Sequence, residues 1–344
     1  MALRQRDPYL DNAKGILIIL VVVGHLLEGV SLGSADALYK WIYLFHMPAF
    51  VFISGYLSRS FRGTPRQSMN LVTTLLIPYV IMQVLMTLEQ VAQGHPFDLN
   101  LFAPTFASWY VFALAVWRLS VPVLRVIPQS IAVCIVVSIV SVTDRGLGLE
   151  FSGARLLAFL PFFAAGLMLT PQRMAAFRDM TNRLWVKVFA AAVMIMMLGA
   201  VYLEHDHIVR AWLYMYGKYD VLGLSGIQNI AVRLAVLAAA SVMITAFLVL
   251  VPRRSGPFTA LGRTTIYIYV LQTVIIFPLL TPIAHWPHWT PLFALLWVVA
   301  GVVLTFALGS RPVRLATQWL VDPANAFGAV RMRLDGRVRD LESS

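Results

Sequence analysis

Charged residues are scarce in this chain of 344 residues, where Asp, Glu, Lys and Arg together make up 12% of the sequence. Soluble domains carry about 25% charged residues, and hydrophobic residues account for 59% of this chain. A soluble core cannot hold so much apolar sequence, so the composition excludes an ordinary soluble protein. It indicates an integral membrane protein.

Cysteine is nearly absent too. The single Cys134 excludes an internal disulfide, and its apolar surroundings are typical of a small buried hydrophobe. The chain has no Gly-rich phosphate loop, no Gly-x-Ser-x-Gly motif and no Cys/His triad. The histidines at positions 25 and 46 lack a third ligand at suitable spacing, so we expect no metal site. The first apolar run is too long for a cleavable signal peptide.

Long apolar runs are what the chain has in abundance. We count ten that could cross the roughly 30 Å hydrocarbon core of a bilayer. The fourth, fifth and sixth are short, and the fifth and sixth could form a re-entrant hairpin, although two spans are the simpler interpretation. We predict an all-α, polytopic membrane domain of about ten transmembrane helices over residues 1–322, followed by a basic tail at 323–344. The ten runs are 8–31, 36–58, 70–92, 104–123, 127–143, 153–170, 184–203, 227–250, 262–283 and 289–310.

The net charge of +11 is unevenly distributed. If the N-terminus is inside, most of the 27 Lys and Arg residues fall in inner segments. This asymmetry follows the positive-inside rule and predicts that both termini are cytoplasmic. We therefore expect the basic residues to meet anionic membrane lipids rather than nucleic acid, and we place the protein in the cytoplasmic (inner) membrane of the cell.

A polar stripe crosses the first apolar run. Eleven positions separate Lys14 from His25, which at about 100° per residue puts both on one helix face roughly 16 Å apart. Asp11 and Glu28 extend the stripe at i−3 and i+3. Ionisable groups inside a membrane helix are costly and by default face a cavity with a function. The alternative is a structural network, in which Asp11 pairs with Lys14 and His25 caps a neighbouring helix.

The second run contains His46 and, two positions later, Pro48. His25 and His46 fall in the outer halves of adjacent helices and could face one cavity. Pro48 would free a backbone carbonyl that needs a cavity or a partner. The alternative here is a kinked helix with a hydrogen-bonded histidine.

A basic cluster, formed by Arg59, Arg62 and Arg66, follows directly. Topology alone explains it, yet it would also attract the phosphates of a ligand such as a CoA thioester.

With these motifs, the sequence resembles the acyltransferase 3 family of membrane acyltransferases. The spacing of Asp11, Lys14 and His25 resembles the first-helix signature of that family, and residues 45–56 resemble its second-helix motif. The similarity extends over about residues 7–322 and is nearest to the fucose 4-O-acetylase-like branch. Weaker motifs are matched by residues 109–114, 160–166 and 261–269.

The resemblance implies transfer of an acyl group, usually acetyl, from cytoplasmic acyl-CoA to a hydroxyl of a sugar or glycoconjugate. His25 would act as general base, and Glu28 or His46 would orient it or place the acceptor. One departure is Gln272, where many relatives have histidine. The residues expected to bind the donor are Lys14, Arg59, Arg62 and Arg66. Those expected at the substrate are Asp11, Trp109, Arg155, Tyr269 and Gln272, with Trp109, Tyr269 and Gln272 as alternative donors to the oxyanion.

A rival hypothesis is a small-molecule transporter or sensor that uses the polar stripe as a proton relay. Pro48 and Pro161 interrupt two of the predicted spans, but the sequences around them do not match as inverted repeats would. Dependence on a thioester separates the two hypotheses, because a transporter needs none. The acceptor could be a surface polysaccharide, a lipid-linked sugar or the sugar of a secreted small molecule, and the oligomeric state is open.

Overall fold

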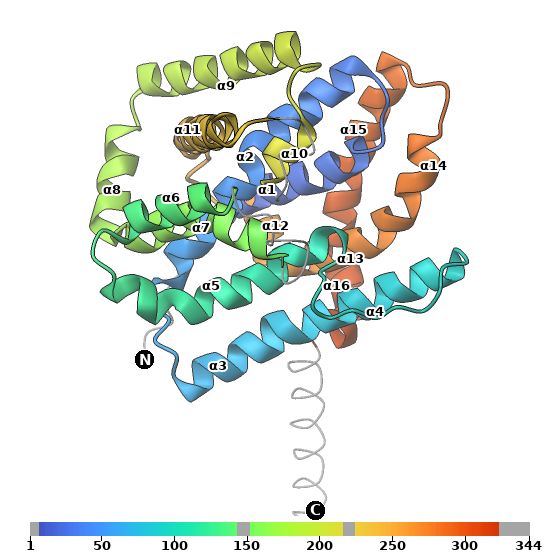
Figure 1. Ribbon diagram of the computed structural model, residues 1–344, viewed down its shortest axis with the longest axis horizontal. Coiled ribbons are helices and arrows are strands. Elements are labelled where there is room, and N and C mark those ends of the chain that lie inside the picture. The colour runs from blue at the N-terminus through green and yellow to red at the C-terminus, as the bar shows by residue number, and fades with distance from the viewer. Residues whose placement is uncertain (1–6, 143–151, 216–223, 323–344) are drawn as a thin grey trace, which may run out of the picture.

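The structure is a computed structural model that describes residues 7–142, 152–215 and 224–322. Within these ranges the chain is helical and contains no strand (Figure 1). Short 3-10 turns, η1 (Ser58–Ser60), η3 (Phe106–Ser108) and η6 (Phe277–Leu279), and a π-helical segment, η2 (Val72–Leu76), join some of the helices. The α-helices are α1 (Pro8–Leu27), α2 (Gly33–Leu57), α3 (Pro65–Leu71), α4 (Ile77–Ala92), α5 (Trp109–Val126), α6 (Ser130–Val140), α7 (Gly153–Met168), α8 (Pro171–Met180), α9 (Leu184–Glu204), α10 (Arg210–Tyr214), α11 (Gly226–Leu250), α12 (Pro257–Arg263), α13 (Thr265–Ile276), α14 (Leu280–Ala284), α15 (Pro291–Leu308) and α16 (Arg311–Val321).

Seven helical segments in the described part of the chain are long and apolar enough to cross a membrane. An eighth is added if α7 and α8, which meet at 90°, count as one broken span. The apolar parts of α5 and α6 are shorter, so the runs predicted to be short are the three that fall outside the seven. The seven are Pro8–Leu27, Gly33–Ser60, Pro65–Ala92, Leu184–Glu204, Gly226–Leu250, Thr265–Ala284 and Pro291–Leu308.

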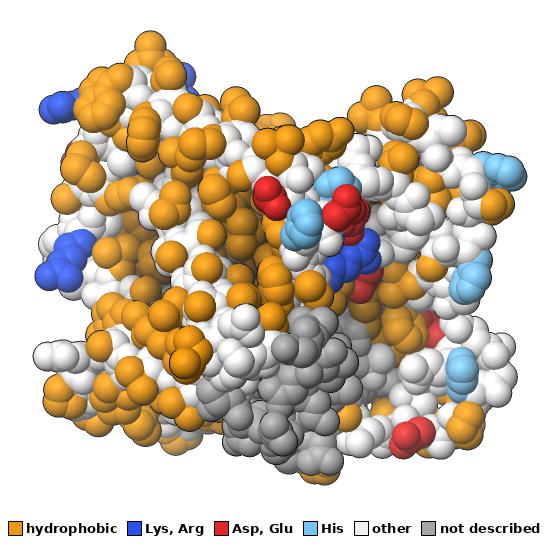
Figure 2. All heavy atoms as spheres, turned by 45° about the horizontal axis from the view of Figure 1, so that its top comes forward, with side chains coloured by type: hydrophobic (Ala, Val, Ile, Leu, Met, Phe, Trp, Pro, Cys, Tyr) orange, Lys and Arg blue, Asp and Glu red, His pale blue; other side chains and the backbone are white. Residues whose placement is uncertain are grey.

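Each of the ten predicted runs coincides with at least one helix, and the chain is a multi-pass membrane protein. On the face shown in Figure 2, hydrophobic side chains cover much of the surface, and charged side chains gather in a few places. The count of ten spans and the cytoplasmic termini stay predictions. The predicted basic tail at 323–344 lies outside the described residues.

Helices α1 and α2 form the centre of the molecule (Figure 1). In each of them 78% of the most apolar stretch is buried, whereas in the peripheral α9 the share is 11%. Helix α1 packs against α12, α13 and α15, while α2 packs against α7, α9 and α11. The first helix, which carries the polar stripe, therefore lies among packed helices and not at the periphery.

Glycines set the two closest helix crossings. Gly15 and Gly262 lie where α1 meets α12, and Gly55 and Gly166 lie where α2 meets α7. A Cβ at any of the four would lie within 2.1 Å of a backbone carbonyl oxygen on the partner helix. Only glycine permits backbones to approach so closely. These contacts fix α12 and α7 against the central pair, and with them the walls of the cavities described next.

Candidate active site

The polar residues of the first helix are divided between two cavities at opposite ends of α1. Asp11 and Lys14 line a cavity near the start of the helix, which we call the basic cavity. His25 and Glu28 line a second one at its end, which we call the histidine cavity. Side chains that share one helix face therefore belong to two sites.

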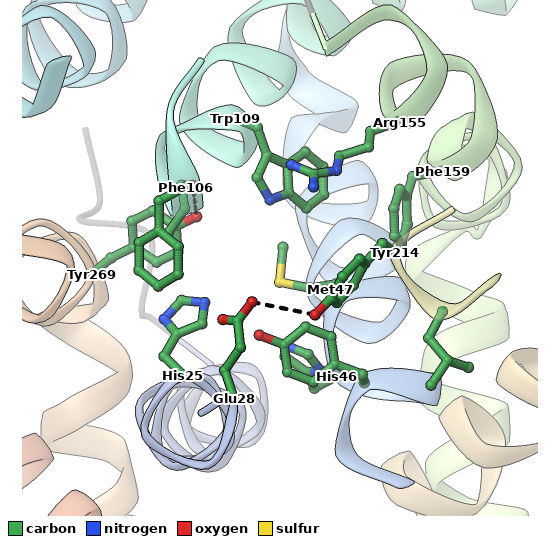
Figure 3. A pocket seen from close by; sticks show the side chains of 13 residues that line it. His25, Glu28, His46, Met47, Phe106, Trp109, Arg155, Phe159, Tyr214 and Tyr269 are labelled. Carbon is green, nitrogen blue, oxygen red and sulfur yellow. Dashed lines mark hydrogen bonds between the residues drawn. The ribbon is translucent and has the colours of Figure 1, made fainter. Parts of the chain in front are cut away.

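The histidine cavity has a volume of about 250 Å³ and is enclosed by α1, α2, η3, α5, α7, α10 and α13. In the view of Figure 3, Trp109 and Arg155 lie across it from His25 and Glu28. Its lining consists of His25, Glu28, Tyr43, His46, Met47, Phe106, Ala107, Trp109, Arg155, Phe159, Leu213, Tyr214 and Tyr269.

His25 lies in the last turn of α1 and is 8% exposed. Its Nδ1 lies 2.9 Å from Oε1 of Gln272 on α13. The ring of Phe106 covers it, with the ring centroids 4.6 Å apart. Among the described residues, His25 forms no hydrogen bond with Glu28 or His46, the two side chains expected to orient it. The structure brings Gln272 to that position instead.

His46 lies in the middle of α2 and is almost fully buried. Its Nδ1 donates to the carbonyl oxygen of Ile42, 2.8 Å away on the same helix, because a carbonyl can only accept. The other ring nitrogen is then left as an acceptor. His25 and His46 line one cavity, as the spacing of the two histidines suggests, and α2 continues through Pro48.

A hydrogen-bond network closes the cavity where α1 ends. The hydroxyl of Tyr214 donates to the carboxylate of Glu28 across 3.3 Å (Figure 3) and also bonds the hydroxyl of Tyr39. Arg210 donates to the carbonyl oxygen of Glu28 at 2.6 Å and to the carboxylate of Asp36 at 2.7 Å. Burial raises the pKa of Tyr214, so its hydroxyl stays protonated. Helix α10, which lies in the predicted outer loop, is thereby fastened over the cavity.

The candidate oxyanion donors differ in whether their protons already form hydrogen bonds within the protein. The hydroxyl of Tyr269 donates to the carbonyl oxygen of Ala107. The indole N–H of Trp109 lines the cavity and donates to no group in the described part of the chain. The guanidinium of Arg155 lies 5.2 Å from the centroid of the Trp109 ring. Trp109 is therefore the candidate whose proton is available to a bound molecule.

A buried glutamine on α4 holds the segment that carries Phe106. Gln83 is 2% exposed, and its amide nitrogen donates to the carbonyl oxygen of Asn100 at 2.9 Å. Its Oε1 accepts from the backbone N–H of Thr105 at 3.0 Å and from the hydroxyl of Ser108 at 2.8 Å. Phe106 between them has a φ of 46°, a left-handed conformation that is unfavourable for a phenylalanine. Sequence reasoning missed Gln83, although a lone amide in an apolar run was a visible signal.

The basic cavity has a volume of about 420 Å³ and lies between α1, the α2–η1 junction and α12. Asp11 is at its centre: its carboxylate lies 2.9 Å from Nζ of Lys14 and 3.4 Å from Nε of Arg263. The guanidinium of Arg59 lies 3.7 Å from the centroid of the Tyr56 ring. The full lining is Asp7, Leu10, Asp11, Lys14, Tyr56, Leu57, Arg59, Ser60, Pro171, Gly262, Arg263 and Thr265.

Two of the four residues expected at the donor, Lys14 and Arg59, meet in this cavity, whereas Arg62 and Arg66 do not line it. Arg263 takes a place there that the sequence did not assign to it. The pair that Asp11 forms with Lys14 is the one the structural interpretation of the stripe expected. The lining carries three cations, Lys14, Arg59 and Arg263, and two carboxylates, Asp7 and Asp11, and this surplus of positive charge suits an anionic ligand.

Comparisons with known proteins show which family the chain is similar to. A family model described as an acyltransferase domain, Acyl_transf_3, matches residues 7–310. Nodulation protein NolL of Mesorhizobium japonicum is 45% identical over 83 residues, which cover 21% of this chain and 22% of that protein. Nodulation protein NolL of Sinorhizobium fredii is 53% identical over 58 residues, which cover 15% of this chain and 16% of that protein. The matches thus span less than a quarter of the length of these relatives, and no solved structure matches the chain.

Proposed function

Because the chain belongs to the acyltransferase 3 family, whose model covers most of its length, we propose that it is a membrane O-acyltransferase. It moves an acyl group, in the usual case acetyl, from acyl-CoA to a hydroxyl of a sugar or glycoconjugate. The observation that carries this proposal is the pair of cavities at the two ends of α1, one with surplus positive charge and one with two buried histidines.

The donor binds from the side of the basic cavity. CoA carries phosphates, and Lys14, Arg59 and Arg263 offer cationic hydrogen-bond donors to them. The rise of α1 places Lys14 and His25 roughly 16 Å apart, a distance that suits a pantetheine arm reaching toward the histidine cavity. The positive-inside distribution of charge supports a cytoplasmic location for this cavity, on the side where acyl-CoA is found.

The transfer step takes place beside His25. The imidazole removes the proton of the acceptor hydroxyl while the hydroxyl oxygen forms a bond with the acyl carbon of the thioester. The carbon–sulfur bond then breaks, and the proton passes to the departing thiolate, which leaves as free CoA. The indole N–H of Trp109 stabilises the negative charge that develops on the acyl oxygen.

The acceptor occupies the remainder of the histidine cavity. Aromatic side chains and a carboxylate line that space, and they suit a sugar, which offers both apolar ring faces and hydroxyls. Helix α10 at this end lies in the predicted outer loop, and we propose that the acceptor enters past it from the outer side of the cytoplasmic membrane. The likeness to the fucose 4-O-acetylase-like branch is in keeping with a sugar acceptor.

The test is release of free CoA from acetyl-CoA by the purified protein, without and with a panel of sugars. We expect an acceptor-stimulated rate that His25→Ala lowers by at least about 100-fold, the usual contribution of a general base. His285→Ala is the matched control, since that exposed histidine bonds only the carbonyl of Thr281. A His25→Ala protein with the full transfer rate would contradict the assignment. A well-folded wild type that neither binds nor cleaves acetyl-CoA would favour the proton-relay hypothesis instead.

A further inference from the structure

The side-chain amide of Gln272 is held in one orientation. Gln272 is fully buried, and its Nε2 lies 2.8 Å from Oγ1 of Thr273 and 3.2 Å from the carbonyl oxygen of Tyr269. A carbonyl oxygen only accepts, so the group that faces it must be the NH₂. The Thr273 hydroxyl donates its proton to the same Tyr269 carbonyl oxygen at 2.8 Å, so it can only accept from Gln272. Turning the amide over would place two oxygens against each other.

The amide orientation determines which nitrogen of His25 carries the proton. With its NH₂ engaged on α13, Gln272 presents Oε1 to Nδ1 of His25 at 2.9 Å. Because Oε1 can only accept, Nδ1 must be protonated. In the neutral ring Nε2 then has a free lone pair, which is what a general base needs.

The contact also fixes where the ring points. Rotation about the side-chain torsions of His25 is limited on one side by the bond to Gln272 and on the other by the ring of Phe106, 4.6 Å away. Neither neighbour carries a charge. The arrangement therefore fixes Nδ1 as a protonated nitrogen and leaves Nε2 as the nitrogen directed into the cavity.

We propose that Gln272 is a positioning residue that holds His25 in the Nδ1–H tautomer and directs its Nε2 toward the acceptor hydroxyl. The consequence for rate rests on the proposed acyltransferase function, whereas the tautomer does not. The same triad logic applies in serine hydrolases, where a third residue sets the tautomer of the base. Here a neutral amide takes the place of the carboxylate.

The first test measures the tautomer directly in the full-length protein. Histidine labelled with ¹⁵N in the imidazole ring is incorporated, and the His25 signals are assigned as those lost in His25→Ala. We expect wild-type His25 to show a protonated Nδ1 and an unprotonated Nε2 at neutral pH. A protonated Nε2 in the wild type would overturn the proposal, and this result needs no variant of Gln272 to fold.

The second test uses substitutions at Gln272. Gln272→Leu removes the acceptor, so we expect the Nδ1–H signature to be lost and kcat to fall by roughly 10- to 100-fold, within the range of general-base effects. The KM for acetyl-CoA should not change, because Gln272 does not line the basic cavity. Gln272→Glu keeps an acceptor for Nδ1, and as the neutral acid it also keeps a donor toward the Tyr269 carbonyl, so in that form it should retain the tautomer and most of kcat. Thr305→Val is the control, since it removes only a buried bond within α15.

The outcomes separate the two proposals. If Gln272→Leu keeps both the Nδ1–H signature and the wild-type kcat, the positioning role is wrong. If the signature is present in the wild type while His25→Ala still transfers acyl groups, the tautomer assignment stands and the proposed function fails. If Gln272→Leu does not fold, the ¹⁵N signature of wild-type His25 decides alone: a protonated Nδ1 supports the role, and a protonated Nε2 opposes it.

Discussion

The two cavities at the ends of α1 are built in opposite ways. In the histidine cavity, His25 and His46 are 8% and 1% exposed, and each is held by a neutral hydrogen bond. In the basic cavity, the side chains of Lys14 and Arg263 are 20% and 48% exposed and are held by ion pairs with Asp11. The difference matches the work proposed for each end: a reacting group must be fixed in place, whereas a phosphate site has to admit and release a large anion.

The physical reason lies in the surroundings of each end. A group deep among apolar helices cannot be satisfied by water, so every polar atom there needs a protein partner, and neutral partners cost least. Near the end of a span, water and anionic headgroups stabilise charges, and long cationic side chains can move. The comparison can be tested by substitutions that act on one cavity only.

The largest effect is expected at Trp109. Trp109→Phe keeps an aromatic ring in the histidine cavity but removes the indole N–H, so kcat should fall by about 100-fold, the cost of losing one oxyanion donor. The KM for acetyl-CoA should stay the same. Steady-state kinetics of acetyl-CoA cleavage check this, with Trp185→Phe on the exposed surface of α9 as the matched control. A change in KM alone would show that Trp109 binds the donor and does not act on the reacting atoms.

A smaller and different effect is expected at Lys14. Lys14→Ala removes one cation of the basic cavity, so the KM for acetyl-CoA should rise by about tenfold, as for loss of one charge-assisted hydrogen bond. The kcat should change little, and Lys14→Arg should restore most of the affinity. Lys187→Ala, which removes a lysine on α9 that lines neither cavity, is the control. A fall in kcat without a change in KM would contradict the separation of the two cavities.

The smallest effect is expected at Tyr214. Its bond to Glu28 is long, at 3.3 Å, so Tyr214→Phe should lower the rate only about threefold, at the lower end for loss of a single hydrogen bond. Since burial raises the pKa of Tyr214, the wild-type hydroxyl keeps its proton and its bond up to at least about pH 10. The ratio of wild-type to variant rates, measured between about pH 7 and about pH 10, should therefore be constant. A ratio that approaches one at the alkaline end would contradict a protonated Tyr214.

Short-range sequence patterns predicted the positions of the helices well, but they predicted poorly which side chains contact His25 and Asp11. Each of the ten apolar runs coincides with at least one helix, although the short helices α8, α10 and α16 lie outside the runs. The i,i+3 spacing identified the pair of Asp11 and Lys14. The same periodicity placed Lys14 and His25 on one face, but could not show that α12 and α13 meet that face at different points. Gln272 was expected at the substrate and not as a partner of His25, and Arg263 was assigned no role in the site. Their partners lie 247 and 252 positions away.

What the sequence by itself determined is the class of molecule: a helical membrane protein with the motifs of acyltransferase 3 and a histidine on a polar face of its first helix. These properties follow from composition and short-range spacing, which act within a few turns of chain. Only the tertiary structure decided that the polar face serves two cavities, that Gln272 contacts His25 and that Gln83 holds Phe106 in place. These contacts depend on the close approach, at glycines, of helices that are distant in the chain. A local sequence pattern does not predict which of these helices will pack together.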